Sequence, residues 1–180
     1  MNFAYVAIGR AALAQAMAAK PITLAVGRGD GVWAGTPPPL NGTETALLDP
    51  FAMVRASGTL YCDLVADISA IPAAELEAMG AEPNPSGYFK DKTGAVWEIA
   101  AEPTMYLYCM FVLSQTAGFG ETMREFAVYI DTVFDAAVPP GQLYNVWGDV
   151  VTPGTPLVMA NEPANLRDGA REAIGVILKF

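Results

Sequence analysis

The stretch TMYLYCMFVLS, from Thr104 to Ser114, and the stretch MREFAVYIDTVF, from Met123 to Phe134, decide the fold class. Both are rich in the β-branched and aromatic residues that favour strands. Similar runs occur at 59–68 (TLYCDLVADI), 95–102 (AVWEIAAE) and 173–180 (AIGVILKF), and Gly, Pro, Asn and Asp fill the spaces between them. The sequence therefore predicts an α+β, β-rich fold with a mostly antiparallel, sandwich-like sheet.

The run from Met105 to Leu113 shows no clean alternation of apolar and polar residues. We expect it to form a strand that is buried on both faces or covered by a partner. GYFKDKTGAVWEI (87–99) predicts a hairpin in which Gly94 takes a positive φ, and VVTPGTPLVMANEP (150–163) predicts a turn at 153–154.

Three segments favour helix. Residues 2–19, except Gly9, tolerate a helix that ends at Lys20-Pro21. Phe3, Val6, Leu13 and Met17 form one stripe and the other faces are mostly alanine, so the helix can pack in a bundle of copies or on its own domain. The segment around Thr43 and Thr45 predicts a short helix that stops at 49–50, and 71–87 is helix-permissive through Met79. The expected organisation is an N-terminal helix at 1–20 and a single β-rich domain at 21–180, with an insert at about 69–87.

Composition limits the classes of partner. The chain has 180 residues, of which 53% are hydrophobic and 16% charged, and its formal charge is −9. So few charges predict an apolar surface that meets another chain, and the acidic balance argues against nucleic acid and anionic membranes as partners. Neither a signal peptide nor a membrane span is expected, so we expect the protein to be made and kept in a cytoplasm.

The chain contains no histidine, which excludes Ser-His-Asp and Cys-His catalysis and removes the commonest metal ligand. The carboxylate pairs Asp131/Asp135 and Glu121/Glu125 remain formal candidates for a hydrolase, although they are typical of surface charge. We therefore expect no catalytic, cofactor-binding or metal-binding residue. The two cysteines, at positions 62 and 109, are free buried thiols or, if their strands are neighbours, a disulfide.

ITLAVGRGDGVWAGTPPPL, from Ile22 to Leu40, resembles several functional motifs but satisfies none. It lacks the lysine of a phosphate-binding loop and the glycine spacing of a dinucleotide site, and an isolated Arg-Gly-Asp is weak evidence for adhesion. Its glycines fit a tight turn, its prolines form a stiff extended strap, and Trp33 is a large apolar anchor. These features indicate an architectural role.

Four stretches in order resemble a known family. They are the Trp33 loop with TPPP and the segment leading to Arg55, then TMYLYCMFVLSQTAGFGETMREFAVYIDT (104–132), PPGQLYNVWGDVVTPGTPLVM (139–159) and REAIGVILKF (171–180). They are similar to small structural proteins of the baseplate or tail-end region in contractile-tailed bacteriophages.

This resemblance implies a structural virion subunit that binds other tail proteins and copies of itself, lies in the tail and is assembled in the host cytoplasm. Its structural or inter-subunit residues would be Trp33, Pro37, Pro38, Arg55, Arg124, Glu125 and Phe180. Arg124 could pair with a carboxylate at a subunit contact, or be an ordinary surface arginine.

The alternative is a small-ligand or carbohydrate-binding β domain. In that case Trp97, Trp147 and Tyr144 would line a pocket, whereas in a structural protein such aromatic residues are part of the core.

Overall fold

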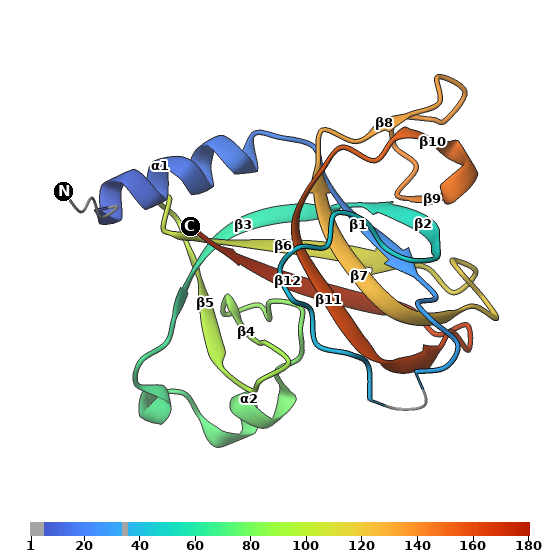
Figure 1. Cartoon of the computed structure of the whole chain (residues 1–180). Coiled ribbons are helices and arrows are strands. Elements are labelled where there is room, and N and C mark those ends of the chain that lie inside the picture. The colour runs from blue at the N-terminus through green and yellow to red at the C-terminus, as the bar shows by residue number, and fades with distance from the viewer. Residues whose placement is uncertain (1–5, 34–35) are drawn as a thin grey trace. The chain divides into compact units, whose positions relative to one another are not determined.

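The computed structural model describes residues 6–33 and 36–180 and consists mostly of antiparallel sheets that follow an N-terminal helix (Figure 1). This confirms the predicted fold class. The chain forms two compact units: Met1–Ala19, Gly58–Met110 and Ala173–Phe180 make up the first, and Lys20–Ser57 and Phe111–Glu172 the second. The single domain expected over 21–180 stays a prediction.

The second unit contains a five-stranded sheet in the order β11-β7-β1-β2-β9 and a two-stranded ribbon, β10-β8. All six residues of the central strand β1 are buried, as expected for a strand made mostly of apolar and β-branched residues. Ala25 lies opposite Met53 on one side and Ala127 on the other, and these residues form the core together with Tyr129. The strands are β1 (Ile22–Gly27), β2 (Pro50–Arg55), β7 (Thr122–Ile130), β8 (Val133–Phe134), β9 (Tyr144–Val146), β10 (Val150–Thr152) and β11 (Thr155–Leu166), and a 3-10 turn, η2 (Trp147–Asp149), precedes β10.

The first unit contains a second five-stranded sheet, in the order β12-β6-β3-β5-β4. Its core includes Cys62, Phe89, Trp97 and Tyr108, and the Phe89 and Tyr108 ring centroids lie 4.4 Å apart. The strands are β3 (Gly58–Leu64), β4 (Tyr88–Lys90), β5 (Val96–Ala100), β6 (Tyr106–Leu113) and β12 (Glu172–Lys179).

Two predictions about these strands are confirmed. Three consecutive residues of β6, at 107–109, are at most 1% exposed, so this strand is buried on both faces. Strands β4 and β5 form the expected hairpin, and Gly94 between them has φ 86°.

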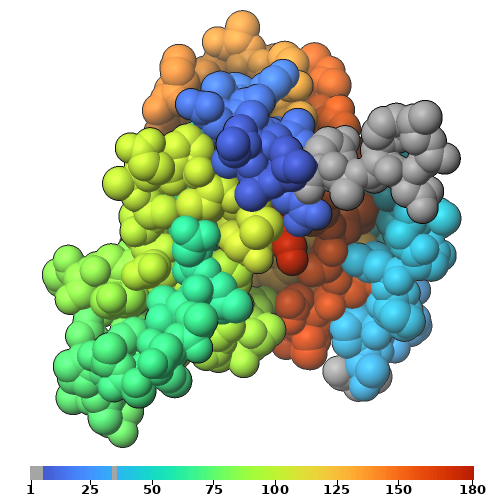
Figure 2. All heavy atoms as spheres, turned by 90° about the vertical axis from the view of Figure 1, so that its left-hand side faces the viewer, coloured from blue at the N-terminus to red at the C-terminus, as the bar shows by residue number. Residues whose placement is uncertain are grey.

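Helix α1 (Ala7–Ala18) confirms the N-terminal helix within the described residues; positions 1–5 lie outside them. Ala14 is its one buried residue, whereas Val6 and Ile8 are 70% and 83% exposed. No side chain caps its N-terminus, and Figure 2 shows one side of the helix uncovered on the face in view. In the insert, a 3-10 turn, η1 (Ile68–Ala70), precedes helix α2 (Ala73–Ala78), in the part predicted to be helix-permissive.

The short helix predicted after Thr43 is wrong: residues 43–49 contain no helix. The Glu44 carboxylate turns back to accept hydrogen bonds from the backbone N–H groups of Asn41 and Gly42, at 2.8 Å each. The Asn41 side chain in turn accepts from the Thr43 N–H. These local bonds satisfy backbone donors in a turn and compete with helix formation.

Cys62 and Cys109 are free and buried, although their strands β3 and β6 are neighbours. Burial raises the pKa of both thiols to about 12. In the part of the chain that the structure describes, no helix has the length and apolar character needed to cross a membrane.

Candidate interaction site

The loop that follows β1 is held by two close approaches to glycine. A Cβ on Gly27 would lie 2.9 Å from a carboxylate oxygen of Glu125, and a Cβ on Gly29 would lie 2.7 Å from the Trp33 ring. Gly29 also has φ 60°, a conformation that side chains disfavour. Gly27 and Gly29 therefore let Glu125 and Trp33 approach the backbone.

Arg28, between these two glycines, is the centre of an ion cluster. Its Nε and Nη2 donate to the two carboxylate oxygens of Glu121 at 2.6 and 2.8 Å, and its Nη1 donates to Asp49 at 3.2 Å. The guanidinium carbon lies 5.0 Å from the centre of the Phe51 ring. The hydrogen bonds from Arg28 hold the pKa of the Glu121 carboxyl below its ordinary value, and the same bonds raise the pKa of Arg28.

Arg124 and Glu125 are neighbours on β7, and successive side chains of a strand point to opposite faces. Arg124 donates from Nη1 to the backbone carbonyl of Arg28 at 3.0 Å, and its Nε is buried without a partner among the described residues. The buried Glu125 carboxylate instead accepts from the backbone N–H groups of Leu48 and Asp49. Each residue fixes a different loop to β7, and they do not act as a pair.

The proline strap runs beside the edge strand β11, because Asn161 donates to the Pro38 carbonyl at 3.0 Å. Pro37 precedes this contact, and the chain then continues to Leu40 and the turn closed by Glu44. A cleft of about 420 Å³ lies between this segment and β11, and it is lined by Leu40, Gly42, Glu44 and residues 156–159.

Arg55 and Phe180 each make contacts of their own. Arg55 lies over the Phe134 ring at 4.0 Å and donates to the Gln142 carbonyl at 3.0 Å, so it ties β2 to the segment around β8. Phe180 belongs to the first unit, where its N–H donates to the Met105 carbonyl. Of the predicted residues, Trp33 lies in the loop after β1, and Arg124 and Glu125 lie on β7 beside it. Pro37 and Pro38 belong to the strap, and Arg55 and Phe180 have the separate contacts given above.

Arg167 was not identified from the sequence, yet it is only 3% exposed and organises a group of loops. It donates to the carbonyls of Ala117, Ser114 and Ala170 and forms a 2.9 Å ion pair with Glu172. The RDG sequence at 167–169, a basic residue directly before an Asp-Gly turn, is the one local signal for this role.

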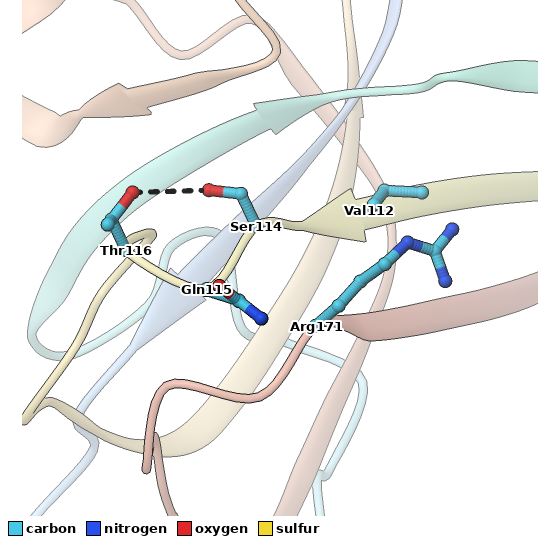
Figure 3. A pocket seen from close by; sticks show the side chains of 5 residues that line it. All are labelled: Val112, Ser114, Gln115, Thr116 and Arg171. Atoms are coloured by element: carbon cyan, nitrogen blue, oxygen red, sulfur yellow. Dashed lines mark hydrogen bonds between the residues drawn. The ribbon is translucent and has the colours of Figure 1, made fainter.

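Beside these loops is a second cleft, of about 430 Å³, lined by Val112, Ser114, Gln115, Thr116 and Arg171 (Figure 3). Ser114, Gln115 and Thr116 lie on the segment after β6, and Arg171 lies just before β12. The Ser114 and Thr116 hydroxyls are 3.4 Å apart. These five described residues offer polar groups for binding, and none of them is a base that could activate a hydroxyl.

The carboxylates considered for hydrolysis have structural partners. Glu121 binds Arg28, Asp131 binds Lys20 at 3.0 Å, and Asp135 accepts from the Ala137 N–H. Among residues 6–33 and 36–180, no group of three His, Cys, Asp or Glu side chains could hold a metal ion.

The aromatic residues considered for ligand binding contribute mainly to the cores. Trp97 is 8% exposed and donates from its indole N–H to Asp91, and Trp147 packs against the core of the second unit. Tyr144 is half-buried on β9.

Comparison with known proteins identifies the family. No curated protein matches the chain. A family model described as "Baseplate wedge 3 tail fiber network component" matches residues 4–180. The match covers nearly the whole chain and confirms the resemblance to bacteriophage baseplate proteins that the sequence motifs indicate. The chain therefore belongs to the family of baseplate wedge 3 tail fiber network components.

Proposed function

We propose that this chain is a non-enzymatic subunit of a contractile tail baseplate, where it holds neighbouring tail proteins together in a symmetric assembly. The family description supports a structural role among other baseplate proteins, in the tail of the virion. Several copies would surround the tail axis, and assembly would take place in the host cytoplasm.

The observation that carries this proposal is that the charged groups in and beside the Trp33 loop are bonded within the chain and hold its loops in place. Arg28 binds Glu121 and Asp49, Arg124 binds a carbonyl, and Glu125 accepts two amide N–H groups. A catalytic site needs a nucleophile, acid or base that can reach a substrate. A loop fixed at this many points is suited to presenting a rigid surface to a neighbouring protein.

Two elements would make the contacts with neighbours. The exposed side chains of helix α1 are mostly apolar, the helix lacks a capping side chain, and it is short for a helix that is stable alone in water. Strand β11 is a long edge strand of its sheet, and edge strands can accept a strand from another chain. Contacts of this kind would hold the neighbours until a trigger strains them.

The test is the composition of purified virions, measured by mass spectrometry of digested particles, together with a low-resolution image of the baseplate. We expect peptides of this chain in intact particles, at a copy number that matches the symmetry of the baseplate. Absence from intact particles would overturn the proposal. A stable monomer that turns over a compound, and loses this activity when one carboxylate is replaced, would overturn the non-enzymatic role.

A further inference from the structure

Residues 131–152, here called the β8–β10 lobe, expose several apolar side chains. Val133 and Val146 are each 51% exposed, and Val151 is 64% exposed. Figure 1 shows β8, β9 and β10 gathered at one end of the second unit. The loop between β8 and β9 adds further exposed apolar residues at 136, 137, 139, 140 and 143. Soluble monomers rarely expose contiguous apolar patches of more than a few hundred Å².

The pairing of β8 with β10 explains why Val133 and Val151 point outward. Phe134 pairs with Val150, and both pack against the core of the second unit. Val133, the neighbour of Phe134 on β8, therefore points to the opposite face. The pairing of Val133 with Thr152 leaves Val151 as an extra residue in β10, and this irregularity turns its side chain to solvent.

The lobe is acidic as well as apolar. The sequence contains no Lys or Arg from position 125 to position 166, whereas Asp131, Asp135 and Asp149 lie in the lobe. Asp131 is paired with Lys20 at 3.0 Å, which leaves the other two as acidic groups of the lobe without a cation partner in the ion pairs found among the described residues. Arg55 does contact the lobe, but its guanidinium lies over Phe134, a residue that packs against the core, and donates to Gln142. Arg55, the last residue of β2, thus attaches the lobe to β2 through these two contacts.

A second copy of the chain does not complement this surface. Contact between two lobes would place Asp135 and Asp149 against like charges, which is unfavourable. All ten Lys and Arg residues of the chain lie outside residues 131–152, so a contact between two lobes brings no basic side chain of the lobe itself to the acidic groups.

We propose that the β8–β10 lobe docks a different protein of the baseplate, through a segment with an apolar centre and a basic rim. Val133, Val146 and Val151 would supply the apolar centre of the contact, and Asp135 and Asp149 its acidic rim. This arrangement is the usual anatomy of a specific protein interface. The inference rests on the proposed function, because it takes the neighbours to be baseplate proteins.

The experiment places a photoreactive amino acid at position 151, and in a second variant at the control position Leu64, in phage whose assembled baseplates are then purified. Leu64 is 50% exposed on β3 of the first unit. We expect position 151, and not position 64, to cross-link to a Lys- or Arg-rich segment of another baseplate protein. A cross-link to a second copy of this chain, or no cross-link from 151 in baseplates that contain the chain, would overturn the inference. Baseplates that lack even the unmodified chain would instead overturn the proposed function.

The affinity for the cross-linked protein, purified alone, then measures each part of the contact. Val151→Ser should weaken binding about tenfold, because one valine leaves the apolar centre. Asp135→Asn keeps the hydrogen bond to the Ala137 N–H but removes the charge, so it should weaken binding about threefold and reduce the salt dependence of binding.

Matched controls come from the first unit. Asp67→Asn keeps a comparable bond, to the Ser69 N–H at 2.9 Å, and Leu64→Ser removes a comparable exposed apolar side chain. Both should bind the partner like the unmodified chain. Equal weakening by the lobe variants and the controls, or unchanged binding in all of them, would overturn the assignment of this surface.

Discussion

Replacement of Gly29 by Ala should destabilise the second unit through two separate effects. Gly29 has φ 60°, and a non-glycine residue in this region costs about 1–2 kcal/mol. The added Cβ would also lie 2.7 Å from the Trp33 ring and 3.2 Å from the Arg124 Cβ. Such overpacking costs about 1–3 kcal/mol. We therefore expect the free energy of unfolding to fall by about 2–5 kcal/mol.

Two other glycines of the same unit separate the two effects. Gly42 has φ 80° but open space around its Cβ position. Gly42→Ala should therefore lower the free energy of unfolding only by the cost of the left-handed backbone, about 1–2 kcal/mol. Gly31 has open space and no positive φ, so Gly31→Ala should be neutral or slightly stabilising. The free energies are measured by urea unfolding, followed by circular dichroism and tryptophan fluorescence.

The steric share depends on Trp33 and can be tested directly. In a double-mutant cycle, Trp33→Ala should remove most of the extra cost of Gly29→Ala, because the ring that the Cβ meets is then absent. If Gly29→Ala is no more harmful than Gly42→Ala, the close packing of Trp33 on this loop is wrong. If it behaves like Gly31→Ala, the left-handed backbone at Gly29 is wrong as well.

Three further predictions concern other parts of the chain. Because Arg28 lowers the pKa of Glu121, the ion pair between them should stabilise the fold at a pH above the ordinary glutamate pKa of about 4.3, and this stabilisation should be lost as the pH falls through the lower pKa of the folded state. In Glu121→Gln, the free energy of unfolding, measured by urea unfolding at each pH, should therefore fall less steeply with acid. Arg167→Ala should lower the free energy of unfolding by about 3–5 kcal/mol, since it strips three backbone carbonyls and a carboxylate of a buried partner, and a loss below 1 kcal/mol in the same assay would contradict this role. Cys62 and Cys109 should resist iodoacetamide at pH 8 until urea unfolds the first unit, which mass spectrometry of the alkylated chain would detect; fast labelling of the folded protein would refute their burial.

Much of the fold follows from local patterns in the sequence. The apolar runs predict most of the strands, and Gly94 predicts the hairpin between β4 and β5 because a short turn with positive φ favours glycine. The order of the strands does not follow in this way. Strand β1 lies between β2, which is near it in sequence, and β7, about a hundred residues further on, and no local propensity encodes that choice.

The helix wrongly predicted after Thr43 also fails because of a contact between residues far apart in the sequence. Its sequence permits a helix, but the N–H groups of Leu48 and Asp49 bind the carboxylate of Glu125 on β7. An acceptor 77 residues from Leu48 cannot be read from the local pattern. The Glu125 carboxylate and the turn closed by Glu44 thus bind backbone N–H groups that would otherwise donate to helix carbonyls.

The glycine-rich segment GRGDG (27–31) resembles a phosphate-binding loop but packs differently. GRGDG lacks the lysine of a phosphate-binding loop, which indicates an architectural role, and the structure adds the physical reason for its first two glycines. Gly27 leaves room for Glu125, and Gly29 leaves room for Trp33 and adopts a left-handed backbone. Arg28 between them forms a bidentate pair with Glu121, so its charge is used within the chain. A phosphate-binding loop needs free N–H groups and an available cation, whereas here the Arg28 N–H binds the Asp49 carbonyl and the cation is paired. The same glycine-rich composition therefore serves to pack side chains against backbone, and we expect the loop to act as a fixed support for protein contacts.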